Sequence, residues 1–122
     1  MIEDDLRDLL ASVQSQSISV YARLIPMEVP ECLSVQHIGG SSSSCSIRKA
    51  VHRVSVLAVS KDRSRAASLM RDARDKLITH LPADINGTHY YYARALMDGT
   101  VRERRLNDSW VEYCDLEVVA SV

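Results

Sequence analysis

One stretch, residues 47–81, most restricts the possible fold, because its hydrophobic period changes once along its length. Residues 47–59 alternate and then become almost continuously apolar, which predicts a strand whose second half is buried on both faces. Ser60 is expected to be the N-cap of a helix that Pro82 ends. The apolar stripe of this helix comprises Ala66, Leu69, Met70, Ala73, Leu77 and Leu81. The stretch predicts a central strand leading directly into a helix across the sheet.

The remaining chain predicts one more helix, over residues 1–14, with carboxylates in the first turn where the helix dipole favours them. Alternating apolar residues predict further strands at 18–25, 32–38, 88–97 and 110–120. Residues 83–87 and Asp98-Gly99 are expected to be turns, and the polar stretch 102–108 leads into the last strand. In the run at 90–92, alternation places Tyr91 on the face opposite to its neighbours. We therefore expect an α+β fold, order α-β-β-β-α-β-β, with a mainly antiparallel sheet of about five strands and two helices.

The size and charge of the chain limit the class of protein. Its 122 residues fit one domain, 1–122, that needs no disulfide to fold. A net charge of −1 provides no overall field toward nucleic acid or an anionic membrane. The chain has no apolar run long enough for a membrane span, and its acidic start is unlike a signal peptide. Its cysteines, which form no CxxC pair, are expected to be reduced thiols in the cytoplasm: Cys32, Cys45 and Cys114.

The sequence offers little for catalysis or metal binding. Cys32, His37, Cys45 and His52 are ligand types that suit zinc, but their spacing matches no common zinc module. Cys45 with a histidine is the one candidate nucleophile, and nothing near it in the sequence would lower its pKa. The chain has no GxSxG motif, phosphate loop or paired-carboxylate signature. We expect no enzyme activity, no metal and no cofactor.

Three segments could form interfaces. Residues 39–46 have the composition of a flexible linker and are expected to form a hairpin loop, either docked on a partner or idle in solvent. The cluster at 102–105 could pair with an acidic surface, line a channel that passes DNA, or be a solvated turn. The arginines of the helix that follows Ser60 could pair with Asp72 and Asp75 on a solvent-exposed face. The candidate interface residues are Gly39, Gly40, Ser41, Ser42, Ser43, Ser44, Arg102, Glu103, Arg104 and Arg105.

The order of these segments resembles the tail terminator proteins of long-tailed bacteriophages and related minor tail or head–tail joining proteins. The resemblance spans nearly the whole chain, from the N-terminal helix onward. It is carried by a meander ending at Val35-Gln36-His37-Ile38-Gly39-Gly40, the strand Val54-Ser55-Val56-Leu57-Ala58, the Arg/Ala-rich helix at 65–74 and the closing strand at 110–118.

The resemblance implies a structural virion protein that forms a ring, typically a hexamer. Such a ring caps the tail tube, ends its elongation and provides the surface for head–tail joining. The implied partners are copies of the chain, the major tail tube protein and the head–tail connector, with DNA passing through the lumen and no membrane contact. The implied location is the tail or neck of the virion after assembly in the host cytoplasm. The alternatives are another neck or head–tail connector protein and a small α+β cellular binding domain.

Overall fold

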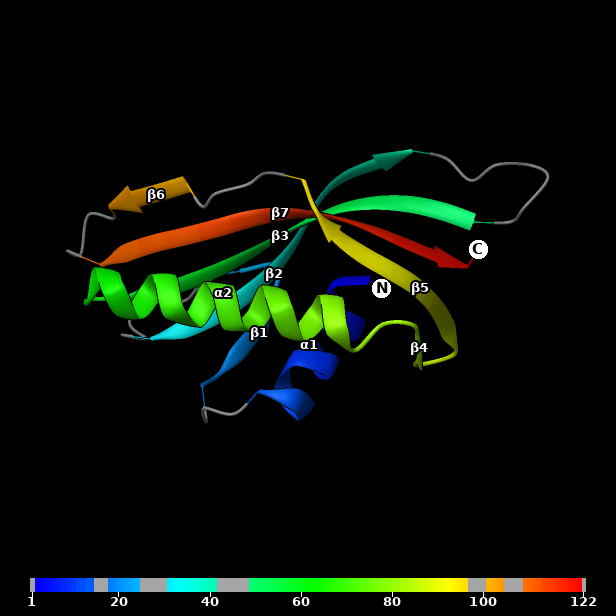
Figure 1. Ribbon diagram of the computed structural model, residues 1–122, viewed down its shortest axis with the longest axis horizontal. Coiled ribbons are helices and arrows are strands. Elements are labelled where there is room, and N and C mark those ends of the chain that lie inside the picture. Colours follow the sequence, from blue (N-terminus) through cyan, green and yellow to red (C-terminus); the bar gives the residue numbers. More distant parts are fainter. Residues whose placement is uncertain are drawn as a thin grey trace.

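The computed structural model describes residues 2–14, 18–24, 31–41, 49–96, 101–104 and 109–121, with residues 41 and 101–104 as backbone alone. These residues form two helices and seven strands (Figure 1): α1 (Ile2–Val13), β1 (Val20–Ala22), β2 (Cys32–Ser41), β3 (Lys49–Ser60), α2 (Arg63–Thr79), β4 (Ala83–Ile85), β5 (Thr88–Ala95), β6 (Val101–Arg104) and β7 (Trp110–Ser121). The strand order is β1-β2-β3-β7-β5-β4, and β6 also pairs with β7. Among the described pairs only β1–β2 is parallel. The predicted α+β class and mainly antiparallel sheet are confirmed.

The predicted central strand is β3, which lies between β2 and β7 and pairs with β7 along its whole length, from Lys49 opposite Ser121 to Ser60 opposite Trp110. Its second half is buried on both faces, as expected. Val54, Val56 and Ala58 lie under the helices, whereas Val59 packs with Cys32 and Val111 on the other face.

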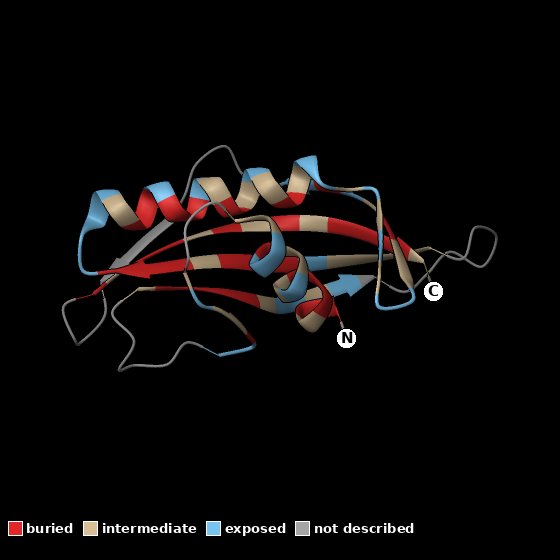
Figure 2. Cartoon of the chain, turned by 90° about the horizontal axis from the view of Figure 1, so that it is seen from below, coloured by how far each residue is buried: buried red, intermediate tan, exposed pale blue. Residues whose placement is uncertain are grey.

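Both helices pack on one face of the sheet and share one hydrophobic core with it. The predicted stripe of α2 is buried from Ala66 to Leu77, and Leu81 packs against the core from beyond the helix end. Leu6 and Leu10 of α1 are fully buried. In Figure 2 the buried residues of α2 face the strands and the exposed ones face outward. Each such leucine contributes about 1.5–3 kcal/mol through burial.

The helix start differs from the prediction. Ser60 is the last residue of β3, and its Oγ donates to Glu31 at 3.1 Å. The N-cap is Asp62, whose carboxylate accepts from the Ser64 backbone N–H at 3.0 Å. Both residue types suit an N-cap. The strand persists to Ser60 because β7 still pairs with it there.

Three strand boundaries also differ. Residues 83–87 form more than a turn, since β4 pairs with β5 across a two-residue turn at Asn86 and Gly87, both with positive φ as a type I′ turn requires. The polar stretch at 102–108, for which no strand was predicted, overlaps β6, which pairs with β7. The strand expected at 18–25 shortens to β1, because Arg23 has a φ of 71° and breaks the extended backbone.

A register shift in β5 overturns the predicted alternation of the tyrosines. The shift lies between Tyr90 and Tyr92. These two neighbours of Tyr91 were expected to share one face of the sheet, and the shift prevents this. Tyr90 is 2% exposed and belongs to the core, whereas Tyr92 is 46% exposed.

Candidate interaction surfaces

The structure places the predicted loop residues Gly39, Gly40 and Ser41 in β2, paired with β3, so the loop cannot begin at 39 as expected. The strand continues past residue 38 through a register shift between His37 and Gly39. The backbones run very close at Gly40, where an added Cβ would lie 2.5 Å from the Val51 carbonyl oxygen. Ser42, Ser43 and Ser44 lie outside the described residues.

A hollow of about 560 Å³ occupies this end of the sheet, lined by Gly39, Gly40, Val51, Arg53, Leu96 and Glu117. Arg53 and Glu117 are paired positions on the face opposite the helices. Glu117 forms an ion pair with Arg94. The exposed Arg53 has no ion pair or hydrogen bond within the part of the chain that the structure describes. Leu96 adds exposed apolar surface, so the hollow offers an apolar patch beside one available cation.

A second hollow, of about 480 Å³, runs along the outer side of α2 and is lined by Arg63, Ser64, Ala67, Ser68 and Arg71. We call it the arginine groove. Arg63 and Arg71 are both exposed, and eight residues of helix separate them by about 12 Å. The Arg63 guanidinium carbon lies 5.4 Å from the centre of the Trp110 ring. The groove therefore presents guanidinium and hydroxyl donors with no carboxylate among its lining residues.

The predicted charged cluster reaches the same end of the sheet. β6 is in register with the start of β7, with Arg102 opposite Glu112, Glu103 opposite Val111 and Arg104 opposite Trp110. Because Arg63 contacts Trp110, the β6 backbone lies near the arginine groove. Arg105 lies outside the described residues.

The pairs expected along α2 form differently from the prediction. Asp75 pairs with its neighbour Arg74 at 3.2 Å, and Arg65 pairs across the fold with Glu31 at 3.2 Å. Sequence spacing could not show Glu31, because it precedes β2 and is 34 residues away.

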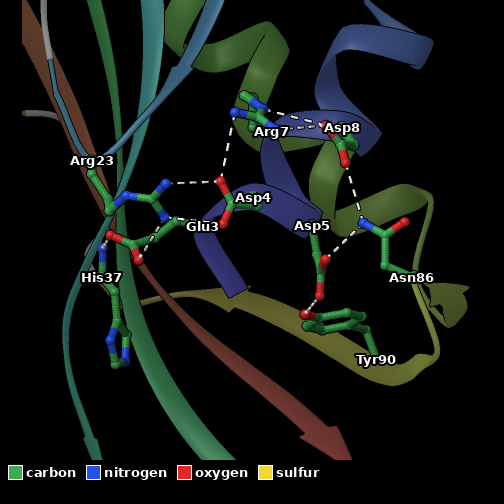
Figure 3. A network of polar contacts seen from close by, with 9 residues as sticks. All are labelled: Glu3, Asp4, Asp5, Arg7, Asp8, Arg23, His37, Asn86 and Tyr90. Atoms are coloured by element: carbon green, nitrogen blue, oxygen red, sulfur yellow. Dashed lines mark hydrogen bonds and ion pairs between the residues drawn. The ribbon is translucent and has the colours of Figure 1, made fainter. Parts of the chain in front are cut away.

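The first turns of α1 carry a cluster of carboxylates, which Figure 3 shows beside the β1–β2 edge. Arg23 donates from Nη1 and Nη2 to the two oxygens of Asp4, each at 3.0 Å. This hydrogen-bonded pairing lowers the pKa of the Asp4 carboxyl. The buried Glu3 accepts the His37 backbone N–H at 3.2 Å, and Arg7 pairs with Asp8 at 3.2 Å.

A buried polar contact fixes α1 to the β4–β5 hairpin. Asp5, 5% exposed, accepts the Tyr90 hydroxyl and, at 2.8 Å, the Asn86 side-chain amide (Figure 3). Burial raises the pKa of the Tyr90 phenol, and the bond to Asp5 raises it further. Sequence analysis missed this contact: it recognised the first-turn acids only as partners of the helix dipole. The Asn-Gly pair was the available signal for the hairpin.

Of the candidate zinc ligands, the described structure brings only the two histidines together. His37 Nε2 lies 3.3 Å from His52 Nδ1, and burial lowers the pKa of His52, with a smaller contribution from His37. Cys32 packs in the small cluster on the opposite face of the sheet, and Cys45 lies outside the described residues. Within the described ranges no three His, Cys, Asp or Glu side chains are placed to hold a metal ion. The same ranges contain no helix long and apolar enough to cross a membrane.

The comparisons with known proteins give a match in fold. No protein-family model matches the sequence, and no curated protein matches it. Among solved structures, a chain of the virion of a native gene transfer agent (GTA) particle is similar, with a TM-score of 0.69 and 12% sequence identity. The match covers 99% of this chain and 95% of that chain. The two chains therefore share one fold over essentially their whole lengths.

Proposed function

We propose that this protein is a structural component of a phage-like virion. The observation that carries the proposal is the similarity in fold to a chain of a gene transfer agent virion. That similarity includes both helices and the whole sheet, because it covers 99% of this chain. A shared motif would support far less, since many unrelated proteins contain a helix packed on a sheet.

More specifically, we propose a tail terminator: a ring of six copies that binds the end of the tail tube. A head-to-tail contact between copies closes into a ring when its rotation permits, and closure uses up the contact surfaces. The ring must bind a finished tube end and refuse another tube subunit, which is selective binding without bond making or breaking. The partners in this proposal are copies of the chain, the tail tube protein and the head–tail connector, with DNA passing through the lumen.

The same similarity supports the neighbouring role of a neck or head–tail connector ring, and one experiment separates the two. Tubes polymerised from the tail tube protein of the same particle would be mixed with the purified chain and viewed by negative-stain electron microscopy. A terminator gives rings at one tube end and stops elongation, whereas an unrelated protein of equal size leaves elongation unchanged. A connector binds DNA-filled heads and leaves bare tubes uncapped. A chain that remains monomeric and binds neither tubes nor heads would overturn the proposal.

A further inference from the structure

The arginine groove follows one face of α2 and gathers groups that donate hydrogen bonds. Arg63, Ala67 and Arg71 are four residues apart and therefore share a face of the helix, with Ser64 and Ser68 in the neighbouring row. The exposed residues of α2 point away from the sheet (Figure 2). Two guanidinium groups and two hydroxyl groups thus line an open hollow of about 480 Å³, with no carboxylate among its described lining residues.

Three carboxylates lie near this part of α2, and none of them pairs with the arginines of the groove. Asp62 is the N-cap and accepts a backbone N–H of the first turn at 3.0 Å. Glu31 pairs with Arg65 at 3.2 Å. Asp72 follows Arg71 in the chain, but successive residues of a helix do not face each other. The positive charge of the groove is therefore left for a ligand.

Both arginines of the groove also keep their hydrogen-bond donors available. Arg63 and Arg71 are exposed, and within the described ranges neither forms an ion pair or a hydrogen bond. The Arg63 guanidinium carbon lies 5.4 Å from the centre of the Trp110 ring, a cation–π contact that positions the group without using its N–H donors. A guanidinium group binds a phosphate through two parallel hydrogen bonds, and serine hydroxyls are further donors to phosphate oxygens.

The length and composition of the groove indicate which class of anion it fits. Eight residues of helix separate Arg63 and Arg71 by about 12 Å. This spacing suits separate phosphates of one duplex strand, which carries a charge about every 3.4 Å along the axis. The described lining has no large apolar or aromatic side chain, whereas protein interfaces have an apolar centre rich in aromatic residues. It also has no ring on which an unpaired base could stack, as single-strand sites do.

We propose that the arginine groove binds the sugar–phosphate backbone of duplex DNA without reading its sequence. Because the net charge is −1, the attraction acts within about one Debye length, ~8 Å at physiological salt, and does not steer DNA from a distance. Each subunit supplies two guanidinium contacts, and a ring of copies multiplies them. The inference rests on the proposed function only for the presence of DNA beside the ring.

The test measures binding of the full chain to a fluorescein-labelled DNA duplex of about 20 base pairs by fluorescence anisotropy, between about 20 and 200 mM salt. Arg71→Gln removes one phosphate contact, so the slope of log K against log salt should fall in magnitude by about 0.9. That change is roughly an eightfold loss of affinity at about 0.1 M salt. The double variant R63Q/R71Q should lose about twice as much slope.

Two further variants serve as controls. Arg71→Lys should keep most of the slope, because an ammonium group still binds phosphate as a point charge. Arg53→Gln makes the same charge change at another exposed arginine that has no partner among the described residues, on the sheet face opposite the helices. It should leave the slope unchanged. Circular dichroism would verify that each variant is folded.

The outcomes separate this inference from the proposed function. A wild-type chain that does not bind the duplex at the lowest salt, or an R71Q slope equal to that of the wild type, would overturn the inference. An equal loss in R53Q would show a general charge effect and overturn it too. If R63Q/R71Q binds DNA normally but no longer caps tail tubes, the groove is a protein contact and the DNA site is wrong. A chain that binds DNA through the groove but leaves tubes uncapped keeps this inference and overturns the terminator role.

Discussion

Replacing Tyr90 with phenylalanine removes one hydroxyl group from the interior and keeps the aromatic ring. Tyr90 is 2% exposed, and its hydroxyl donates to Asp5, which is itself 5% exposed. In the variant the carboxylate keeps the Asn86 amide at 2.8 Å but loses the Tyr90 hydroxyl, its other side-chain donor among the described residues. Because α1 and β5 meet through this bond, the substitution tests how strongly the helix is fixed to the sheet.

A hydrogen bond to a charged group contributes about 1.5–3 kcal/mol to the free energy of unfolding, and a buried carboxylate that loses a donor is left with its desolvation cost. We therefore expect Tyr90→Phe to destabilise the protein by about 2 kcal/mol. With a urea m-value of about 2 kcal/mol/M, the unfolding midpoint should fall by about 1 M. Equilibrium urea unfolding followed by circular dichroism measures this shift.

A double-mutant cycle with Asp5→Ala isolates the contact. If the pair interacts as described, the second substitution costs less once the first is present, with a coupling of about 1.5 kcal/mol or more. A coupling within about 0.3 kcal/mol of zero would refute the reasoning.

Alkaline pH gives a second readout of the same contact. The folded pKa of Tyr90 is raised above its ordinary value of 10.0, so its contribution to stability is full below that pH and is lost as the pH rises above it. Tyr90→Phe should remove the part of the loss of stability at alkaline pH that the ionisation of Tyr90 causes. If the stability of the variant fell above pH 10 as steeply as that of the wild type, this prediction would be wrong.

Three further substitutions test other parts of the structure. Leu6→Ala, at a fully buried position, should lower the free energy of unfolding by about 2–5 kcal/mol, whereas the control Leu24→Ala, 55% exposed, should change it by less than about 0.5 kcal/mol in thermal unfolding. Gly40→Ala should cost about 1–3 kcal/mol, because its Cβ would meet the Val51 carbonyl oxygen; a melting temperature equal to that of the wild type would argue against this close approach. The pKa of His52 is lowered in the folded protein, so its contribution to stability is present above pH 6.5 and is lost as the pH falls below that value. His52→Gln should therefore flatten the fall in stability below pH 6.5. A fall as steep as that of the wild type would contradict this prediction.

The sequence predicted the parts of the fold that depend on local period. β3 and α2 were recognised because their apolar residues repeat at two different spacings over long segments, and both face the core as expected. The short strands β4 and β6 were missed because three or four residues carry almost no period, and their pairing is decided by β5 and β7. The tyrosine run failed for a related reason, since a register shift is a property of two strands and leaves little trace in one.

The candidate surfaces were less predictable, because they combine residues that are distant in the chain. Gly39 and Arg102 were singled out from composition, and the structure gives each a strand position. The cations available for contact were found only after partners had been assigned in three dimensions: Arg65 is paired with Glu31, whereas the similarly placed Arg71 is not paired among the described residues. A sequence shows how many arginines a helix has, but not which of them the fold already uses.

The way α1 is anchored shows how the fold uses its acidic residues. Leu6 and Leu10 are fully buried in the shared core, Asp5 is bound by Tyr90, and Glu3 holds the His37 backbone N–H on the β2 edge. Glu3 thereby occupies a donor that would otherwise be open to another strand, so the edge is protected against non-specific pairing. The acids of one helix thus have two roles: buried Glu3 and Asp5 hold the helix on the sheet, and the more exposed Asp4 and Asp8 pair with Arg23 and Arg7 at the surface.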